Sequence, residues 1–140
     1  MADLVFVYGT LTDDAQVAAL LDSYRFVDDA ICVGLQRVDG RYPTLVPGES
    51  VTGRLLETSE LDRLDRYEGV DRGLYHRVSV PLGSSLATTV SATTASVYLA
   101  APNSLGLGSL DRYWPGEGSF VDRVDRHLPT VEIKHISTNG

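Results

Sequence analysis

The chain has 140 residues, a length typical of one domain, and 43% of them are hydrophobic, which is enough to bury a core. Its net charge of −7 argues against nucleic-acid binding, because phosphate recognition needs clustered positive charge. The sequence contains no apolar run long enough to cross a membrane and no visible signal peptide. We therefore expect a single domain over residues 1–140 in the cytoplasm, with a small-molecule ligand and neither a membrane nor a nucleic-acid partner.

The chain opens with a predicted buried strand over residues 3–8, and a helix is predicted from Thr12 to about Leu21. The loop between them exposes backbone N–H groups that can hold an anion, because the first N–H groups of a helix lack internal partners. Gly9 would let the backbone approach a ligand closely or adopt a positive φ. Junctions of this kind are also common as plain connections, so both roles stay open.

Extended segments dominate the next part of the chain. Residues 25–38 are predicted as a strand with Gly34 at a bulge. A short extended piece, 42–45, should end at Pro47-Gly48, and a separate strand is predicted over 51–57.

A short helix is then predicted from a capping box at Ser59 to about Glu68, with Gly69 closing it. Leu61, Leu64 and Glu68 are spaced i, i+3 and i+7, so they share one helical face. If the leucines face the core, burial should raise the pKa of the Glu68 carboxyl, as a general acid or base at neutral pH requires. Alternatively, Glu68 could turn into water or pair with Arg72 or Arg77.

The second half of the chain again favours strands. Two of them are predicted, at 75–82 and at about 88–100, separated by Gly83-Ser84-Ser85. A last helix is predicted over 120–128, with a short strand within the final dozen residues. Strands outnumber helices, so the fold class is predicted to be α+β, a mixed α/β domain built on a curved sheet or barrel.

Five segments between residues 4 and 100 together resemble the motifs of one family. They are Tyr8-Gly9-Thr10-Leu11, Val51-Thr52-Gly53-Arg54-Leu55, Leu64-Asp65-Arg66-Tyr67-Glu68-Gly69, Gly73-Leu74-Tyr75-His76-Arg77 and Ala95-Ser96-Val97-Tyr98. In this order and spacing they are similar to the γ-glutamylcyclotransferase-like superfamily, which includes AIG2-like proteins and γ-glutamylamine cyclotransferase. Residues 101–140 lie outside the resemblance.

The resemblance implies a mixed β-barrel with short flanking helices and an enzyme that needs no cofactor. Such an enzyme converts a γ-glutamyl amine or peptide into 5-oxoproline and a free amine or amino acid. The family's catalytic carboxylate corresponds to Glu68, and its signature loop corresponds to Tyr8, Gly9, Thr10 and Leu11, which would bind the substrate. Tyr75 is a further substrate-binding candidate. A non-catalytic binding protein for a small carboxylate-bearing metabolite, or another ring-closing or amide-cleaving acyl transfer, remains an alternative.

Other chemistry-bearing residues favour structural roles. The three histidines are scattered without metal-ligand spacing, so no metal site is expected. Cys32, the single cysteine, is expected to be a small buried side chain. Arg77 is expected to pair with an acid, and Trp114 to anchor either the core or a lid.

The charged residues have an unusual composition, with 11 Arg against one Lys and 13 Asp against 6 Glu. An acidic, Asp-rich and Lys-poor surface suits a salt-rich cytoplasm, where screening weakens the repulsion between like charges. A GC-rich genome would give the same bias without salt adaptation. Purification at low and at high salt would separate the two explanations.

Overall fold

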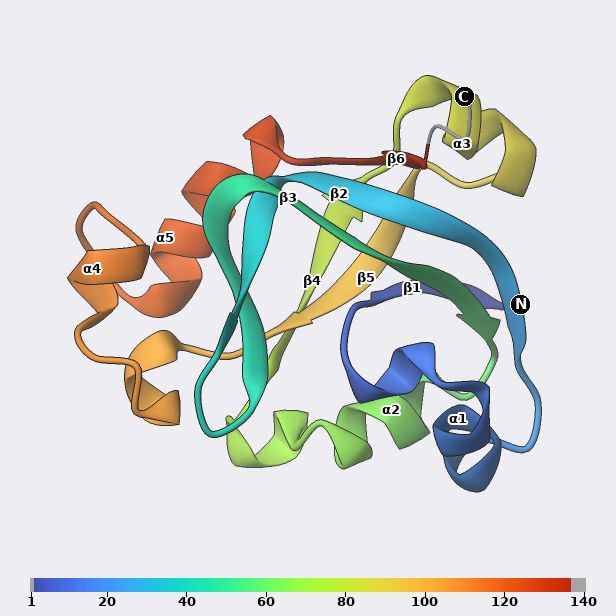
Figure 1. Cartoon of the computed structure of the whole chain (residues 1–140), viewed down its shortest axis with the longest axis horizontal. Helices are drawn as coiled ribbons and strands as arrows, with labels where there is room; N and C mark the ends of the chain where they lie inside the picture. The colour runs from blue at the N-terminus through green and yellow to red at the C-terminus, as the bar shows by residue number, and fades with distance from the viewer. Residues whose placement is uncertain (1, 137–140) are drawn as a thin grey trace.

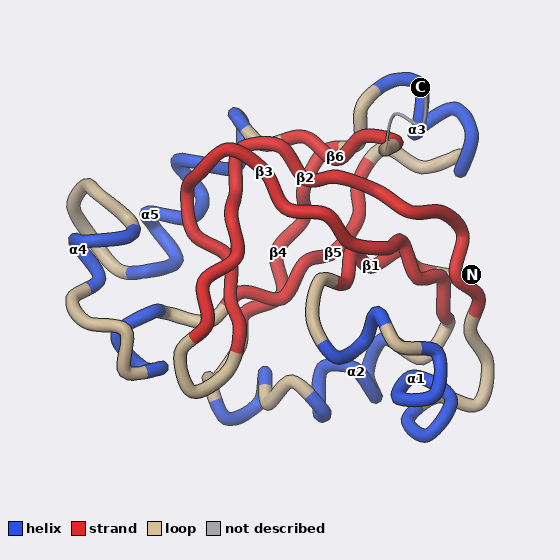
Figure 2. Tube along the Cα trace, viewed as in Figure 1, coloured by secondary structure: helices blue, strands red, loops and turns tan. Residues whose placement is uncertain are grey.

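A curled six-stranded sheet organises the computed structural model, which describes residues 2–136 (Figures 1 and 2). The strand order is β4-β5-β1-β3-β2-β6, with β1 and β5 parallel and the other pairs antiparallel. The strands are β1 (Asp3–Val7), β2 (Arg25–Asp39), β3 (Pro43–Thr58), β4 (His76–Pro81), β5 (Thr94–Leu99) and β6 (Glu132–His135). The sheet curls into a half-barrel. An isolated bridge between Leu82, just after β4, and Ile133 of β6 links its two edge strands. The predicted α+β class is confirmed.

Short helices flank this sheet at two places. In Figure 1, α1 and α2 lie below the sheet, whereas α4 and α5 lie at the left, beyond the β2–β3 hairpin. The α-helices are α1 (Asp14–Leu20), α2 (Leu61–Tyr67), α3 (Ser84–Val90), α4 (Leu110–Tyr113) and α5 (Phe120–His127). The single-turn 3₁₀ helices are η1 (Thr10–Thr12), η2 (Val70–Arg72), η3 (Pro102–Leu105) and η4 (Leu128–Thr130). No helix within residues 2–136 is both long and apolar enough to span a membrane.

Strand β1 separates two hydrophobic clusters. Leu4 and Phe6 point into the larger cluster, and Val5 and Val7 point into the smaller one, which α1 and α2 cover. Side chains alternate between the faces of a strand, so a strand covered on both faces must be apolar throughout. This explains the uninterrupted apolar run that predicted β1. It also leaves the C-terminal end of β1 between the two clusters, where the chain enters the loop before η1.

The predicted break at Pro47-Gly48 is wrong, because β3 runs continuously from Pro43 to Thr58. Pro47 is tolerated because β1 pairs only with residues 54–58 of β3, so no strand needs a donor on that side of Pro47. On the other side Pro47 lies opposite Leu35, next to the register shift between Val33 and Leu35. A bulge therefore lies at Gly34, as predicted, but its extra residue belongs to β3, where Gly48 and Glu49 fall between the partners of Val33 and Leu35.

Two further boundaries differ from prediction. The predicted strand from residue 88 begins only at Thr94, because residues 84–90 form helix α3. The β-branched threonines favoured a strand, but the hydroxyls of Thr88 and Thr89 donate to carbonyls one turn earlier and Leu86 is buried.

The capping box at Ser59 is absent, since Glu60 is the N-cap of α2 and its side chain makes no capping bond.

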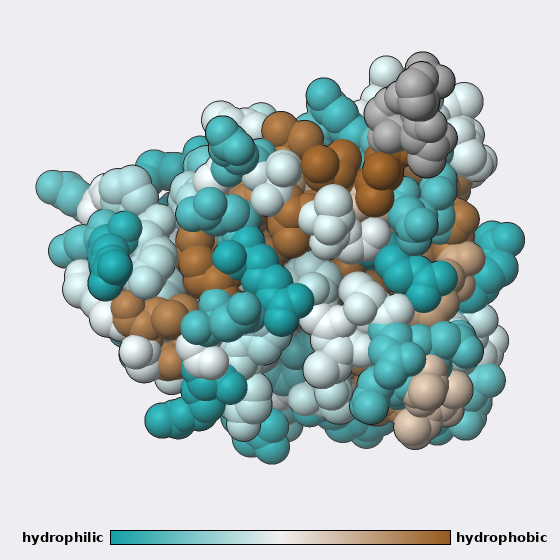
Figure 3. Space-filling model, in the orientation of Figure 1, coloured by the Kyte–Doolittle hydropathy of each residue, from teal (hydrophilic) through white to brown (hydrophobic). Residues whose placement is uncertain are grey.

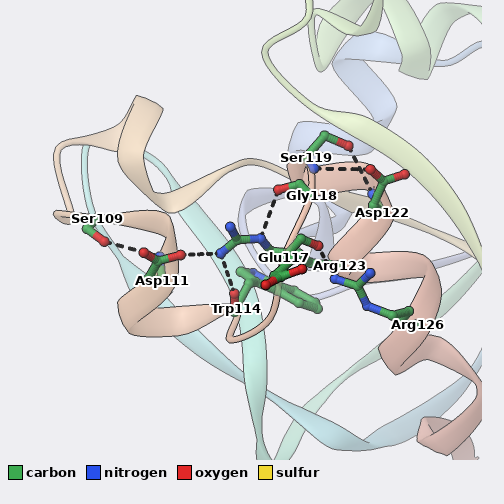
Figure 4. A network of polar contacts seen from close by, with 9 residues as sticks. All are labelled: Ser109, Asp111, Trp114, Glu117, Gly118, Ser119, Asp122, Arg123 and Arg126. Carbon is green, nitrogen blue, oxygen red and sulfur yellow. Dashed lines mark hydrogen bonds and ion pairs between the residues drawn. The ribbon is translucent and has the colours of Figure 1, made fainter.

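The C-terminal part of the domain is held by a polar network around Arg123 of α5 (Figure 4). Its guanidinium donates to the carbonyls of Gly118 and Trp114, at 3.0 Å and 2.9 Å, and pairs with Asp111 at 2.5 Å. Ser119 and Asp122 form a capping box at the start of α5. Trp114 is 1% exposed, so it is a core residue rather than part of a lid.

The face of the molecule seen in Figure 3 is mainly polar. In the view of Figure 3, hydrophilic residues cover most of the face, and hydrophobic residues show between them over the β2–β3 region. Val121 of α5 is an exposed hydrophobic residue, at 43%. The apolar face of α5 is instead carried by Phe120 and Val124, which are both buried.

Candidate active site

A cavity of about 400 Å³ opens where the loop after β1, the end of α2 and the start of β3 meet. This volume lies in the range of small-molecule sites. All six residues that the sequence proposed line this one cavity: Tyr8, Gly9, Thr10, Leu11, Glu68 and Tyr75. The remaining lining residues are Phe6, Val7, Tyr42, Pro43, Tyr67, Arg72, Leu74 and Tyr98. The structure thus brings together the two motifs that lie far apart in the sequence.

The loop after β1 presents its N–H groups without partners. Its carbonyl groups are engaged, because Arg37 donates to the oxygen of Tyr8 at 2.8 Å and the Thr12 hydroxyl donates to that of Gly9 at 2.7 Å. Within residues 2–136, by contrast, the backbone N–H groups of Gly9, Thr10 and Leu11 have no hydrogen-bond acceptor. Because these residues line the cavity, an anionic or carbonyl oxygen placed there would complete their hydrogen bonding.

Of the two reasons offered for a glycine at position 9, a positive φ does not apply. Its φ is −124°, which other residues also adopt. A Cβ at Gly9 would lie 3.4 Å from Cγ of Pro43, across the cavity wall. A single Cβ would thus fit there in ordinary van der Waals contact, whereas a larger side chain would extend into the space beside the cavity that Gly9 lines.

Glu68 lies at the C-terminal end of α2, where its N–H donates to the carbonyl of Leu64 at 2.9 Å. Gly69 follows with a φ of +71° and turns the chain out of the helix, as predicted. Leu64 is fully buried one turn earlier, so the shared face of α2 directs Glu68 inward. Its carboxyl lines the cavity, and burial raises its pKa from 4.5 to about 7.

The Glu68 carboxylate is not neutralised by the protein. Among residues 2–136 it forms neither an ion pair nor a side-chain hydrogen bond, and neither predicted alternative partner is engaged with it. Arg77 instead pairs with Asp65 at 2.9 Å, while Arg72 lines the same cavity without an ion pair to Glu68. A half-buried carboxylate with a pKa near 7 and no partner is suited to accept and donate a proton.

Three tyrosines around the cavity differ from Glu68, because their hydroxyl groups already donate hydrogen bonds within the protein. Tyr75 donates to the carbonyl oxygen of Pro43 at 2.5 Å, and Tyr8 donates to that of Tyr98 at 2.6 Å. Tyr98 in turn donates to Asp65 at 2.7 Å. Burial is the main cause that raises the pKa of all three phenols above their ordinary value, so they stay neutral. They form walls and can accept hydrogen bonds from a ligand.

Sequence reasoning missed several lining residues, notably Tyr42, Tyr67, Arg72 and Tyr98. Tyr67 and Tyr98 belong to the quoted motif segments, so they could have been noticed as aromatic residues next to the proposed site. Tyr42 reaches the cavity only because the β2–β3 hairpin folds over it, a contact that no local pattern indicates.

The other residues weighed earlier have structural surroundings. Cys32 is fully buried, and burial raises the pKa of its thiol to about 12, so it is not a nucleophile at neutral pH. His127 contacts the carbonyl of Gly34 at 2.8 Å, and His135 pairs with Asp28 at 2.8 Å. Within residues 2–136, no group of three or more His, Cys, Asp or Glu side chains is placed to hold a metal ion.

Comparison with known sequences identifies a family and a curated relative. The family model described as "Gamma-glutamyl cyclotransferase, AIG2-like" matches residues 5–118, and so extends beyond the five segments to include part of the C-terminal region. AIG2-like protein A of Arabidopsis thaliana is 36% identical over 81 residues, which cover 54% of this chain and 49% of that protein. The match therefore spans about half the length of the curated relative.

Solved structures share the fold. An uncharacterized protein from Homo sapiens aligns with a TM-score of 0.61 and 19% identity, over 89% of this chain and 97% of that one. A structure titled "Gamma-glutamyl cyclotransferase" aligns with a TM-score of 0.60 and 17% identity, over 93% of this chain and 99% of that one. At these identities the likeness concerns the fold alone, and the half-barrel with its flanking helices is common to all three proteins.

Proposed function

The chain belongs to the gamma-glutamyl cyclotransferase, AIG2-like family, and from that premise we propose that it is an enzyme that releases 5-oxoproline from a γ-glutamyl amine or peptide. One observation carries the proposal. The unpaired carboxyl of Glu68 and the unpaired N–H groups of Gly9, Thr10 and Leu11 line one cavity, although 57 residues separate Leu11 from Glu68. A cyclotransferase needs both kinds of group at the same substrate.

The reaction begins with positioning. The α-amine of the glutamyl group attacks its own γ-carbonyl, so the nucleophile is part of the substrate and the protein has to fold the glutamyl chain into a ring-like shape. The N–H groups of Gly9, Thr10 and Leu11 would bind the glutamyl carboxylate or the oxyanion that develops on the γ-carbonyl. The buried aromatic walls, among them Tyr75, limit the space in which the chain can bend.

Glu68 would carry the protons. In its ionised form it takes a proton from the α-ammonium group, which frees the lone pair for attack on the γ-carbonyl. The ring C–N bond then forms and the bond from the γ-carbon to the leaving nitrogen breaks. The ring nitrogen keeps one hydrogen, while the leaving nitrogen gains two and departs as an ammonium ion. Protonated Glu68 gives the first proton to the leaving nitrogen and, once ionised again, takes the second proton from the ring nitrogen and passes it on. The two protons lost by the α-ammonium group are the two that the leaving nitrogen gains, so the atoms balance without water or a cofactor.

The pKa of Glu68 suits both halves of this cycle. A group with a pKa of about 7 is present in both protonation states at neutral pH. It can therefore act as a base toward the α-ammonium group and as an acid toward the leaving nitrogen. A solvent-exposed glutamate, with a pKa near 4.3, would be a weaker base and would rarely hold a proton to donate.

The test is an assay for 5-oxoproline with a panel of γ-glutamyl amines and γ-glutamyl dipeptides. We expect the wild-type chain to release 5-oxoproline from at least one of them. Glu68→Gln should reduce kcat by roughly 10²- to 10⁴-fold, as is usual for the loss of a general acid–base group. Glu49→Gln is the matched control, because Glu49 is exposed on β3 and lies outside the cavity, so turnover should not change.

Two results would contradict the proposal. Near-normal turnover by Glu68→Gln would exclude Glu68 as the proton carrier. Binding of γ-glutamyl compounds without release of 5-oxoproline by the wild-type chain would favour a non-catalytic binding protein on the same fold.

A further inference from the structure

The mouth of the cavity is formed by exposed side chains, in contrast to its floor. Tyr42 and Tyr67 are 48% and 47% exposed, and both line the cavity. Arg72 is also exposed and lines it with them. The floor consists of buried side chains such as Leu11. A substrate whose glutamyl part reaches Glu68 therefore has its other end, the leaving amine, near these three exposed residues.

The backbone fixes Arg72 at this wall. It is the last residue of the single turn η2, and the glycines on both sides, Gly69 and Gly73, have positive φ values of 71° and 74°. The Arg72 guanidinium lies over Gly69, because a Cβ added there would come within 2.9 Å of its Nη2 atom. The glycine next to Glu68 thus leaves room for the charged group of Arg72 beside the proposed proton carrier.

The charge of Arg72 is available to a ligand. Two neighbouring arginines have acidic partners, Arg66 with Asp62 and Arg77 with Asp65. Arg72 has no ion pair or side-chain hydrogen bond with any residue in 2–136, and it is the one cationic side chain among the residues lining the cavity. Glu68 does not neutralise it either, since no ion pair joins them.

We propose, on the basis of the proposed function, that Arg72 binds a carboxylate on the leaving amine and that the chain therefore prefers γ-glutamyl amino acids to γ-glutamyl derivatives of uncharged amines. A guanidinium presents parallel N–H donors that match the two oxygens of a carboxylate. When the N–H groups of the loop after β1 bind the glutamyl carboxylate, that carboxylate does not compete for Arg72. If Arg72 bound the glutamyl carboxylate instead, Arg72→Met would lower kcat/KM equally for both substrates of the test below, which would overturn the proposal. The rings of Tyr42 and Tyr67 would cover the rest of the leaving amino acid.

The experiment compares two substrates that differ only in this carboxylate, γ-glutamylalanine and γ-glutamylethylamide. For the wild-type chain we expect kcat/KM to be about fivefold higher for γ-glutamylalanine, the upper end of what an exposed ion pair contributes. Arg72→Met should bring the ratio close to one, mainly through a higher KM for γ-glutamylalanine, and should lower kcat/KM for γ-glutamylethylamide far less than kcat/KM for γ-glutamylalanine. Arg72→Lys keeps the charge and should retain part of the preference.

Arg66→Met is the matched control, because Arg66 is an exposed arginine of α2 that lies outside the cavity lining. It should keep the wild-type substrate ratio, and circular dichroism should show that all three variants are folded. A wild-type ratio near one, or an unchanged ratio in Arg72→Met, would overturn the role of Arg72 while the release of 5-oxoproline still supports the proposed function. Failure of the wild-type chain with both substrates, while another member of the panel releases 5-oxoproline, would overturn the role of Arg72 alone. Failure with the whole panel would overturn the proposed function as well.

Discussion

The network around Arg123 and the cavity around Glu68 differ in whether their charged side chains have protein partners within residues 2–136. In the network of Figure 4, Arg123 is bonded to two carbonyl groups and a carboxylate, and Ser119 and Asp122 satisfy each other. In the cavity, the Glu68 carboxyl and the N–H groups of the loop after β1 have no partner within residues 2–136. Both regions belong to the same chain, so the difference is not a general looseness of packing.

The difference indicates where the fold keeps hydrogen-bonding capacity for a ligand. Glu68 is half-buried and has no partner within residues 2–136, so its carboxyl can still form hydrogen bonds with a ligand. Arg123 donates hydrogen bonds to the carbonyls of Gly118 and Trp114 and so holds the turn before α5 in place. Within residues 2–136, the Glu68 carboxyl and the loop N–H groups form no such bonds, so they remain available to a ligand in the cavity. Substitutions around Arg123 should therefore lower the free energy of unfolding, whereas substitutions in the cavity should lower kcat/KM.

The largest effect is expected from filling the cavity beside the loop. Gly9→Val places two methyl groups between the loop and Pro43, where a single Cβ already reaches a contact of 3.4 Å. We expect kcat/KM for a γ-glutamyl substrate to fall about 100-fold, the loss typical of a misplaced substrate, with little change in stability. Gly9→Ala is the control and should lose far less. Normal substrate binding by Gly9→Val would show that the loop is only a connection.

Arg123→Met should produce the opposite result. The Arg123 side chain is 11% exposed, and its removal leaves two carbonyl groups and Asp111 without their donor. We expect the free energy of unfolding to fall by about 2 kcal/mol in chemical denaturation, with kcat/KM of the folded protein unchanged. Arg112→Met is the control, since Arg112 only lies over the ring of Tyr113. A loss of activity without a loss of stability in Arg123→Met would remove the contrast between the two regions.

Tyr75 combines the two roles, because it lines the cavity and also donates a structural hydrogen bond to the carbonyl of Pro43. Tyr75→Phe keeps the wall but removes that bond. We expect a loss of about 1 kcal/mol in stability and less than a tenfold decrease in kcat/KM. A decrease comparable to that of Glu68→Gln would mean that the Tyr75 hydroxyl takes part in the chemistry, and the two roles would then coincide in one residue.

The smallest effect is the pH dependence of stability. The pKa of Glu68 is raised from 4.5 to about 7, so between these values the folded chain holds a proton that the unfolded chain has lost. Rising pH therefore lowers the free energy of unfolding across this window. Glu68→Gln should remove this loss and unfold at higher denaturant concentration than the wild type at pH 8, by on the order of 1 kcal/mol after solvent screening. Equal stability at pH 8 would show that Glu68 is not desolvated.

Much of the site could be predicted because its signals are local. The apolar run of β1 and its end at Gly9 follow from the chain's own pattern, and so does the face that Glu68 shares with Leu64. The resemblance to a known family added the link between these two motifs, and the structure brings them to one cavity. Local spacing also indicated the bulge at Gly34 and the turn at Gly69.

The errors arose where tertiary contacts override local preference. Pro47 looked like the end of a strand, but β3 continues because its other edge is unpaired there. Residues 88–90 looked like a strand, but burial of Leu86 and hydroxyl bonds to the helix backbone favour α3. Arg72 and Tyr42 could not be assigned to the cavity from sequence, because the turn η2 and the β2–β3 hairpin bring them there.

The central claim, that the unpaired Glu68 carboxyl carries the protons, is tested most directly by the pH dependence of kcat/KM for 5-oxoproline release. This parameter reports the pKa of essential groups in the free enzyme. The account predicts that kcat/KM rises between pH 5 and 8 with a midpoint near 7, the pKa that burial gives to Glu68, and that Glu68→Gln lacks this rise. A flat profile, or the same rise in Glu68→Gln, would contradict the account.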